Sequence, residues 1–114
     1  MLVYFAAPYS GHADKEQLML DFMTISGRYM LTYPGQHAVS PLFNHYSLKH
    51  VPEMGSDWEF WKQYSTDLIR RCDKLVVVQF EGWDTSKGVD GEIQLAQFLG
   101  IPIVYVRPEN YLHE

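Results

Sequence analysis

The chain has 114 residues, of which 46% are hydrophobic and 15% aromatic, so it can bury one core as a single domain over residues 1–114 and is not a disordered chain. Its net charge of −5 argues against a binder of duplex nucleic acid, which would carry a basic stripe, but leaves a small phosphorylated ligand open. No apolar run approaches the roughly 20 residues that cross a bilayer, and the single cysteine excludes an internal disulfide, so we expect a cytoplasmic protein with no membrane partner.

The first half of the chain predicts a strand, a helix and a second, shorter strand. Residues 2–7 form a continuously apolar run that ends at Pro8, which is typical of a buried strand followed by a loop. Asp14 is a good N-cap for a helix over residues 15–31. Its inward face is predicted to comprise Leu18, Phe22, Ile25 and Tyr29. Residues 37–40 are consistent with a short strand.

The second half begins with a stretch that lacks a clear period, over residues 42–55, and long connections of this kind often carry functional residues. Residues 56–59 have the spacing of a capping box and predict a helix start. Residues 74–80 hold the strongest strand signal. A helix over about residues 88–99 and a last strand over 101–106 follow.

Strands that alternate with helices predict an α/β fold with helices on both faces of the sheet. The expected architecture is a small Rossmann-like or flavodoxin-like three-layer sandwich with a mainly parallel sheet of four to five strands. In such sheets, ligands bind beyond the carboxyl ends of the strands. Those ends are expected at residues 8–12, 40–46 and 80–88 and after residue 106.

One side chain does not fit the apolar pattern of the last helix. At about 100° per residue, the buried face is predicted to comprise Val89, Ile93, Ala96 and Leu99, and Glu92 lies on the same face. A buried carboxylate is costly unless it is hydrogen-bonded or has a task. A fixed, partly desolvated carboxylate is what a sugar nucleophile requires. A glutamate that only complements the helix dipole or caps Gly88 would explain the same pattern.

Residues 82–96, Gly-Trp-Asp-Thr-Ser-Lys-Gly-Val-Asp-Gly-Glu-Ile-Gln-Leu-Ala, resemble the signature of nucleoside 2-deoxyribosyltransferases, in which a G-x-x-x-E-x-x-x-A segment follows the third strand and opens a helix. Residues 4–10 resemble the first-strand motif of this superfamily, and residues 72–78 and 100–104 fit its later elements. The chain resembles in particular a little-characterised bacterial and phage branch with a G-W-x-x-S-x-G-V-x-x-E-I pattern. The resemblance covers most of the chain.

This resemblance implies that Glu92 attacks the anomeric carbon of a sugar and displaces the base, leaving a glycosyl-enzyme intermediate that water or a second base resolves. Tyr4 matches the tyrosine that hydrogen-bonds and orients the nucleophile, although a core aromatic would also explain it. The family uses no cofactor or metal and takes a nucleoside or nucleotide as its small-molecule partner. It forms homodimers or larger homo-oligomers, in which residues 107–114 of one chain could complete the site of another.

Ser86 bears on the substrate. Transferases that act on free nucleosides tend to have an Asp here, whereas the related 2′-deoxynucleoside 5′-monophosphate N-hydrolases have a Ser that binds the phosphate. Ser86, the Gly88 amide and the helix N-terminus are therefore expected to hold a 5′-phosphate, although an ordinary capping serine is an equal explanation. The loop after the first strand is expected to add Ala7, Pro8, Tyr9, Ser10 and Gly11 to the substrate site.

The chain departs from the family at Ser65, where an Asp usually works on the departing base. Asp67 does not replace it, because it points about 200° away around the helix. His45 is a candidate general acid, since histidine exchanges protons near neutral pH, although a surface loop histidine is the commoner case. Trp83 is a candidate for stacking on the base. Trp61 lies three residues after Trp58 on the predicted helix, and this spacing favours a place in the core.

Three functions remain open at this point. The leading one is cleavage or transfer at the N-glycosidic bond of a (deoxy)nucleoside or nucleoside 5′-monophosphate, which the pairing of Tyr4 with Glu92 favours. The alternative is a protein of the same fold that binds a nucleotide or nucleotide-derived signal without turning it over, which the loss of the Asp at Ser65 favours. The third, weaker one is a purely structural partner protein.

Overall fold

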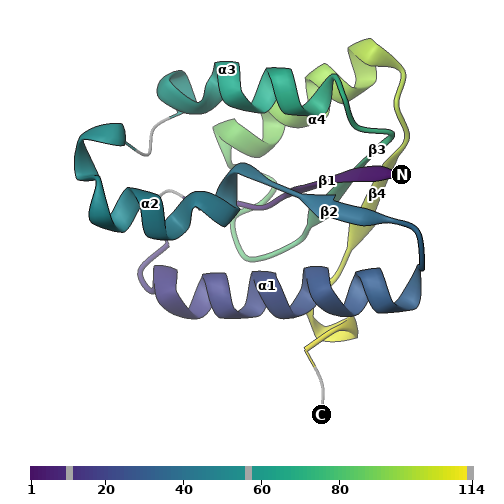
Figure 1. The fold of residues 1–114 in the computed structure, drawn as a ribbon, viewed down its shortest axis with the longest axis horizontal. Helices are drawn as coiled ribbons and strands as arrows, with labels where there is room; N and C mark the ends of the chain where they lie inside the picture. The colour runs from purple at the N-terminus through teal and green to yellow at the C-terminus, as the bar shows by residue number, and fades with distance from the viewer. Residues whose placement is uncertain (10–11, 56–57, 113–114) are drawn as a thin grey trace.

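The computed structural model describes residues 1–9, 12–55 and 58–112. Four strands form one sheet: β1 (Leu2–Ala6), β2 (His37–Val39), β3 (Lys74–Val78) and β4 (Ile103–Val106). They lie in the order β2-β1-β3-β4, and each neighbouring pair is parallel (Figure 1). The expected parallel α/β architecture is confirmed, and the strand order is that of a small flavodoxin-like sheet.

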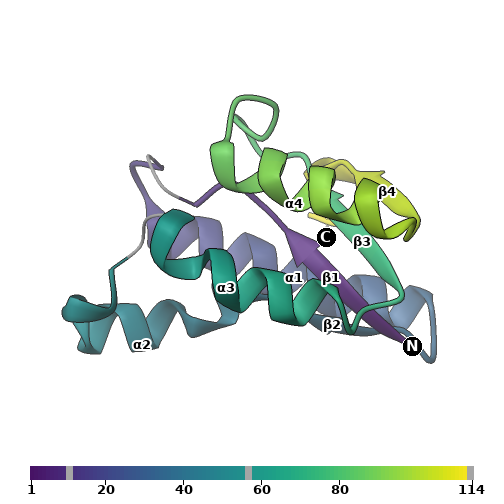
Figure 2. The ribbon, with the colours of Figure 1, turned by 90° about the horizontal axis from the view of Figure 1, so that it is seen from above.

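Helices cover both faces of this sheet. Figure 1 shows α1 (Lys15–Thr32) below the sheet and α3 (Trp58–Ile69) and α4 (Lys87–Leu99) above it. Figure 2 shows α3 and α4 side by side on their face. Each face of the sheet has its own buried apolar cluster, one against α1 and one against α3 and α4, so the molecule has three layers.

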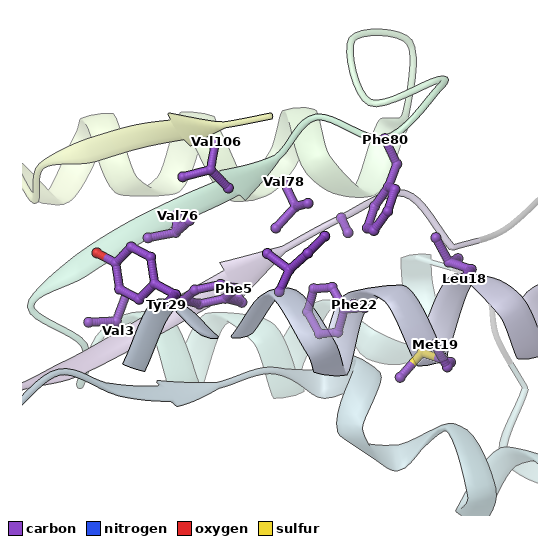
Figure 3. Packing of buried hydrophobic residues seen from close by; sticks show 12 residues of the cluster. Val3, Phe5, Leu18, Met19, Phe22, Tyr29, Val76, Val78, Phe80 and Val106 are labelled. Carbon is purple, nitrogen blue, oxygen red and sulfur yellow. The ribbon is translucent and has the colours of Figure 1, made fainter. Parts of the chain in front are cut away.

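The side chains of β1 alternate between these two clusters, as the pleat of a strand requires. Val3 and Phe5 pack toward α1, and Figure 3 shows Phe5 beside Phe22 of that helix. Tyr4 and Ala6 point the other way, into the cluster under α3 and α4. This alternation is what carries the Tyr4 side chain to the face on which Glu92 lies.

Helix α1 follows its sequence pattern closely. The Asp14 carboxylate accepts a hydrogen bond from the backbone N–H of Gln17 at 3.0 Å and caps the helix. All four residues of the predicted inward stripe are buried: Leu18, Phe22, Ile25 and Tyr29. Each such side chain stabilises the fold by roughly 1.5–3 kcal/mol relative to exposure.

The connection between β2 and α3 differs from the prediction of an irregular stretch. It contains the 3-10 turns η1 (Pro41–Asn44) and η2 (Pro52–Met54), with the helix α2 (His45–His50) between them. Helix α2 is too short to show an apolar period, and its one buried residue is a histidine. The first two residues of the predicted capping box at 56–59 lie outside the described residues.

The ends of other elements also differ from the predictions by a few residues. Strand β3 ends at Val78 rather than at residue 80, and β4 begins at Ile103. Leu99, predicted to be buried, is 37% exposed at the end of α4, where the chain turns at Gly100 with a left-handed φ of 73°. Beyond β4 the chain forms η3 (Pro108–Asn110) and packs against α1 of its own chain, where Arg28 donates to the carbonyl of Tyr111.

Candidate functional site

A cavity of about 410 Å³ lies beyond the carboxyl ends of β1, β2 and β3. Strand β2 lies on one side of β1 and β3 lies on the other, so the strand order reverses direction at β1. The cavity therefore lies at the topological switch point of the sheet, where ligands of such folds bind. Its volume is in the range of sites for small molecules. The wall comprises Phe5, Ala6, Ala7, Tyr9, Ser40, Pro41, Leu42, Leu48, Trp61, Ser65, Thr85, Ser86, Lys87, Gly88 and Glu92.

Glu92 lies on the inner face of α4, in the wall of this cavity, and only 8% of it is exposed. Its burial agrees with the helical pattern of the sequence. The hydroxyl of Tyr4 donates a hydrogen bond to Oε2 of Glu92, and Oγ of Ser65 lies 3.0 Å from the same hydroxyl. A strand and two helices therefore bring one carboxyl and two hydroxyl groups together.

The directions of these hydrogen bonds follow from the number of protons available. A phenol carries one proton, so when Tyr4 donates to the carboxylate of Glu92, the hydroxyl of Ser65 donates to Tyr4. The chain of donors then ends on the carboxylate and stabilises its charge. These hydrogen bonds also offset the cost of burying the three polar groups, because each group has a hydrogen-bond partner.

Burial and hydrogen bonding act in opposite directions on the pKa of Glu92. Desolvation raises this pKa to about 8, and the hydrogen bond from Tyr4 opposes the rise. The pKa of Tyr4 is held well above its usual value, first by burial and then by the neighbouring charge of Glu92. Tyr4 thus remains a donor, while Glu92 exchanges its proton close to neutral pH, which is common for carboxyl groups in active sites.

The N-terminus of α4 forms another part of the wall. Ser86 caps the helix, since its Oγ accepts from the backbone N–H of Val89 at 3.3 Å, and it also lines the cavity with Gly88. Thr85 and Lys87 lie beside them in the wall. The capping explanation of Ser86 does not exclude the ligand-binding one, because Ser86 both caps α4 and lines the cavity.

Several residues expected at the site do line the cavity, namely Ala7, Tyr9, Ser65, Ser86, Gly88 and Glu92. Tyr4 is fully buried behind the wall and reaches the site through Glu92. Pro8 is buried but is not part of the wall. Ser10 and Gly11 lie outside the described residues.

His45 and Trp83 do not line the cavity. His45 is buried, with both ring nitrogens hydrogen-bonded, so it is neither a surface loop histidine nor a group facing the cavity directly. Trp83 packs with the cluster under α4 and against Tyr105, at 5.6 Å between ring centroids. Trp61 does line the cavity, and its Nε1 donates to the carbonyl of Gly55 at 2.8 Å.

Some wall residues were not singled out from the sequence. Two of the segments expected to border a ligand, residues 40–46 and 80–88, contain five of them: Ser40, Pro41, Leu42, Thr85 and Lys87. Nothing in the sequence pointed to Leu48, because the short helix that carries it shows no period. The helical spacing of Trp61 predicts core packing, and in the structure this side chain is buried and also lines the cavity.

Two further features concern ions and membranes. Across residues 1–9, 12–55 and 58–112, no three His, Cys, Asp or Glu side chains lie close enough together to hold a metal ion. Within the same ranges, no helix has the length and apolar character needed to cross a membrane.

The fold and cavity define a class: a small parallel α/β protein with a ligand-sized cavity, and a buried carboxyl group in its wall, at the switch point of the sheet. Residues 1–107 match the model of a family described as a domain of unknown function (DUF1937), and the chain belongs to this family. No curated protein matches it.

Proposed function

We propose that the protein cleaves or transfers the N-glycosidic bond of a (deoxy)nucleoside or nucleoside 5′-monophosphate, with Glu92 as the nucleophile. The observation that carries this proposal is the Glu92 carboxyl group, buried in the cavity wall and hydrogen-bonded by Tyr4. It also rests on the resemblance of residues 82–96 to the nucleoside 2-deoxyribosyltransferases. A rigid, desolvated carboxylate beside a cavity is suited to covalent catalysis at a sugar carbon.

In the proposed reaction, an oxygen of Glu92 forms a bond to the anomeric carbon while the bond from that carbon to the base breaks. The electron pair of the broken bond leaves with the base, and the sugar stays attached to Glu92. Water then breaks this ester in hydrolysis, or a second base does so in transfer. Tyr4 holds the attacking carboxylate in one orientation through its hydrogen bond.

The part of the wall at the N-terminus of α4 favours a phosphorylated substrate. Ser86 and Thr85 offer hydroxyl groups, Gly88 offers a backbone N–H at the N-terminus of α4, and Lys87 offers a positive charge. An Asp at position 86 would repel a phosphate, whereas a serine can donate to it. We therefore place nucleoside 5′-monophosphates ahead of free nucleosides as substrates.

The direct test is incubation with a panel of nucleosides and 5′-monophosphates, followed by chromatography for free base. We expect base release by the wild type, a loss of at least about 100-fold in Glu92→Gln, and unchanged release in Glu81→Gln, which alters an exposed glutamate just before α4. Release that survives in Glu92→Gln would refute the role of this residue as nucleophile.

A second candidate is a protein that binds such a nucleotide without turning it over. Two observations favour it. Among the described residues of the wall, Glu92 carries the only carboxyl group, so no second one is present to protonate the base. Burial also raises the pKa of Glu92 to about 8, so the group is mostly neutral at pH 7. A neutral carboxyl group donates a hydrogen bond well but attacks poorly. Tight binding with no base release from pH 6 to pH 9 would favour this candidate.

A further inference from the structure

A second chain of hydrogen bonds runs from solvent to the same cavity. Tyr9, in the wall, has its hydroxyl oxygen 2.7 Å from Nδ1 of His45. Nε2 of His45 lies 3.1 Å from Oε1 of Glu16. The His45 side chain is 6% exposed and that of Glu16 is 50% exposed, so the chain begins at the surface, passes through a buried imidazole and ends at the cavity.

We propose that Glu16, His45 and Tyr9 form a proton relay through which Tyr9 protonates the departing base. This inference rests on the proposed function, because it supplies the acid that Ser65 cannot provide. Within the described part of the chain, the wall residues with a titratable group are Glu92, Tyr9 and Lys87, and Tyr9 is the one that is hydrogen-bonded to a histidine.

The partners fix the direction of each hydrogen bond. A carboxylate only accepts, so Nε2 of His45 carries a proton that it donates to Glu16. In the neutral ring Nδ1 is then an acceptor, and the Tyr9 hydroxyl donates to it. When the ring gains a second proton, Nδ1 donates to the Tyr9 oxygen instead, and the Tyr9 proton is released to a group in the cavity.

The surrounding charges suit this exchange. Glu16 also accepts from Nζ of Lys49 at 3.0 Å, and the hydrogen bonds from His45 and Lys49 lower the pKa of Glu16, so it remains an acceptor. Burial, and then the charge of Glu16, raise the pKa of Tyr9, so Tyr9 passes a proton without becoming a stable phenolate. Two more side chains lie against the relay: Nζ of Lys15 is 5.5 Å from the centre of the Tyr9 ring, and Tyr46 contacts the His45 ring.

The step balances without any other reagent. As the bond from sugar to base breaks, a nitrogen or oxygen of the base takes the proton of the Tyr9 hydroxyl, and Tyr9 takes the proton on Nδ1 of His45. The base leaves neutral, Tyr9 is restored, and His45 becomes neutral with its remaining proton directed at Glu16. A proton from solvent then recharges the ring next to the exposed end of the relay.

The first test needs no activity. Nitrogen-15 NMR of the histidine rings identifies the tautomer of neutral His45, assigned by comparison with His45→Gln. We expect the proton on Nε2 and a changed Nδ1 resonance in Tyr9→Phe. A neutral ring with its proton on Nδ1 would overturn the relay, because a ring that passed this proton to Tyr9 would be left as an anion.

The second test uses the leaving group. On the 5′-monophosphate that the wild type cleaves fastest, Tyr9→Phe should lower kcat/KM by about 100-fold or more. On a 4-nitrophenyl glycoside of the same sugar, whose leaving group departs as an anion, the same change should cost less than about threefold. Tyr105→Phe makes the same chemical change at an exposed tyrosine of β4 that does not line the cavity, and should leave both rates unchanged.

Each outcome decides between the proposals. An equal loss on both substrates, or none on either, would overturn the relay while leaving Glu92 as the nucleophile. If the wild type cleaves only the nucleotide, the double variant decides: Tyr9→Phe and His45→Gln should each lower kcat/KM, and the double variant should lose no more than Tyr9→Phe alone, whereas losses that multiply would overturn the relay. A wild type that releases no base overturns the proposed function and, with it, the relay.

Discussion

At the residue scale, the site depends on how one carboxyl group is accommodated. The Tyr4 hydroxyl donates to Glu92 and is itself hydrogen-bonded by Ser65, but neither hydroxyl carries a charge, so desolvation prevails and the pKa of Glu92 is raised to about 8. An aspartate at position 65 would place a second carboxylate next to Tyr4 and disfavour the charge on Glu92 further. The serine present here thus avoids placing a second negative charge beside the proposed nucleophile.

This raised pKa has a consequence for stability. The pKa of Glu92 is about 8 in the folded protein and near 4.5 in the unfolded chain, so the unfolded chain loses its proton first as the pH rises. The free energy of unfolding is therefore highest below about pH 4.5, where Glu92 is neutral in both states, and it falls progressively up to about pH 8. The wild type should therefore become less stable relative to Glu92→Gln across this window, by on the order of 4 kcal/mol at pH 8.

Urea unfolding of both proteins at several pH values from 4 to 9 measures this difference. Glu81→Gln is the matched control, because it removes an exposed glutamate and should keep a constant offset from the wild type. Parallel pH curves for the wild type and Glu92→Gln would mean that the carboxyl group is charged in the folded protein at neutral pH.

At the scale of elements, the strands and the long helices could be predicted because their patterns are local. The apolar run of β3, the stripe of α1 and the cap at Asp14 each reflect a few neighbouring residues. The burial of Glu92 followed from one helical period. Helix α2 could not be predicted, because it has six residues and its place is set by contacts of His45 with Tyr9 and α1.

The sequence could predict only in part which side chains of the site contact each other, because these contacts join residues that are far apart in the chain. The pairing of Tyr4 with Glu92 came from the resemblance, and the structure joins them across 88 positions of sequence. No pattern linked His45 to Glu16, because such pairs depend on how α1 and α2 meet. Trp83 was placed in a loop that could reach the cavity, but its large apolar ring packs on the α4 side of the core.

The first turn of α4 allows the two roles of Ser86 to be separated. Ser86→Ala removes the cap on the Val89 N–H and should cost about 1 kcal/mol of stability. Ser86→Asp keeps a good cap and should restore most of this stability, because a carboxylate also complements the helix dipole. If Ser86 faces a phosphate, however, Ser86→Asp should weaken binding of 5′-monophosphates at least about tenfold by charge repulsion.

Denaturant unfolding and titration calorimetry on the same three proteins test both parts. Free nucleosides serve as the control ligands, since their affinity should respond little to Ser86→Asp. Equal losses for nucleosides and nucleotides would place the phosphate elsewhere. Unchanged stability in Ser86→Ala would mean that the cap contributes nothing and that position 86 is free to serve a ligand.

At the scale of the whole molecule, the sheet order is what assembles the site. Because β1 lies between β2 and β3, the loops after these three strands meet at one edge, and α1, α2, α3 and α4 each add a side chain around it. One polar chain, from Ser65 through Tyr4, ends on Glu92, and the other, from Glu16 through His45, ends on Tyr9. The two proposed roles, attack on the sugar and protonation of the base, thus come to one cavity from different layers of the fold.

This convergence makes ligand binding measurable as stability of the whole fold. A nucleotide that binds only the folded protein should stabilise it by about 2.7 kcal/mol at 100 times its Kd, which raises Tm by about 10 °C for a domain of this size. An enzyme consumes the nucleotide, so the rise in Tm should decay during incubation of the wild type and of Glu81→Gln but persist in Glu92→Gln. A rise that persists in all three proteins would indicate a binding protein, and no rise with any nucleotide would favour a structural partner.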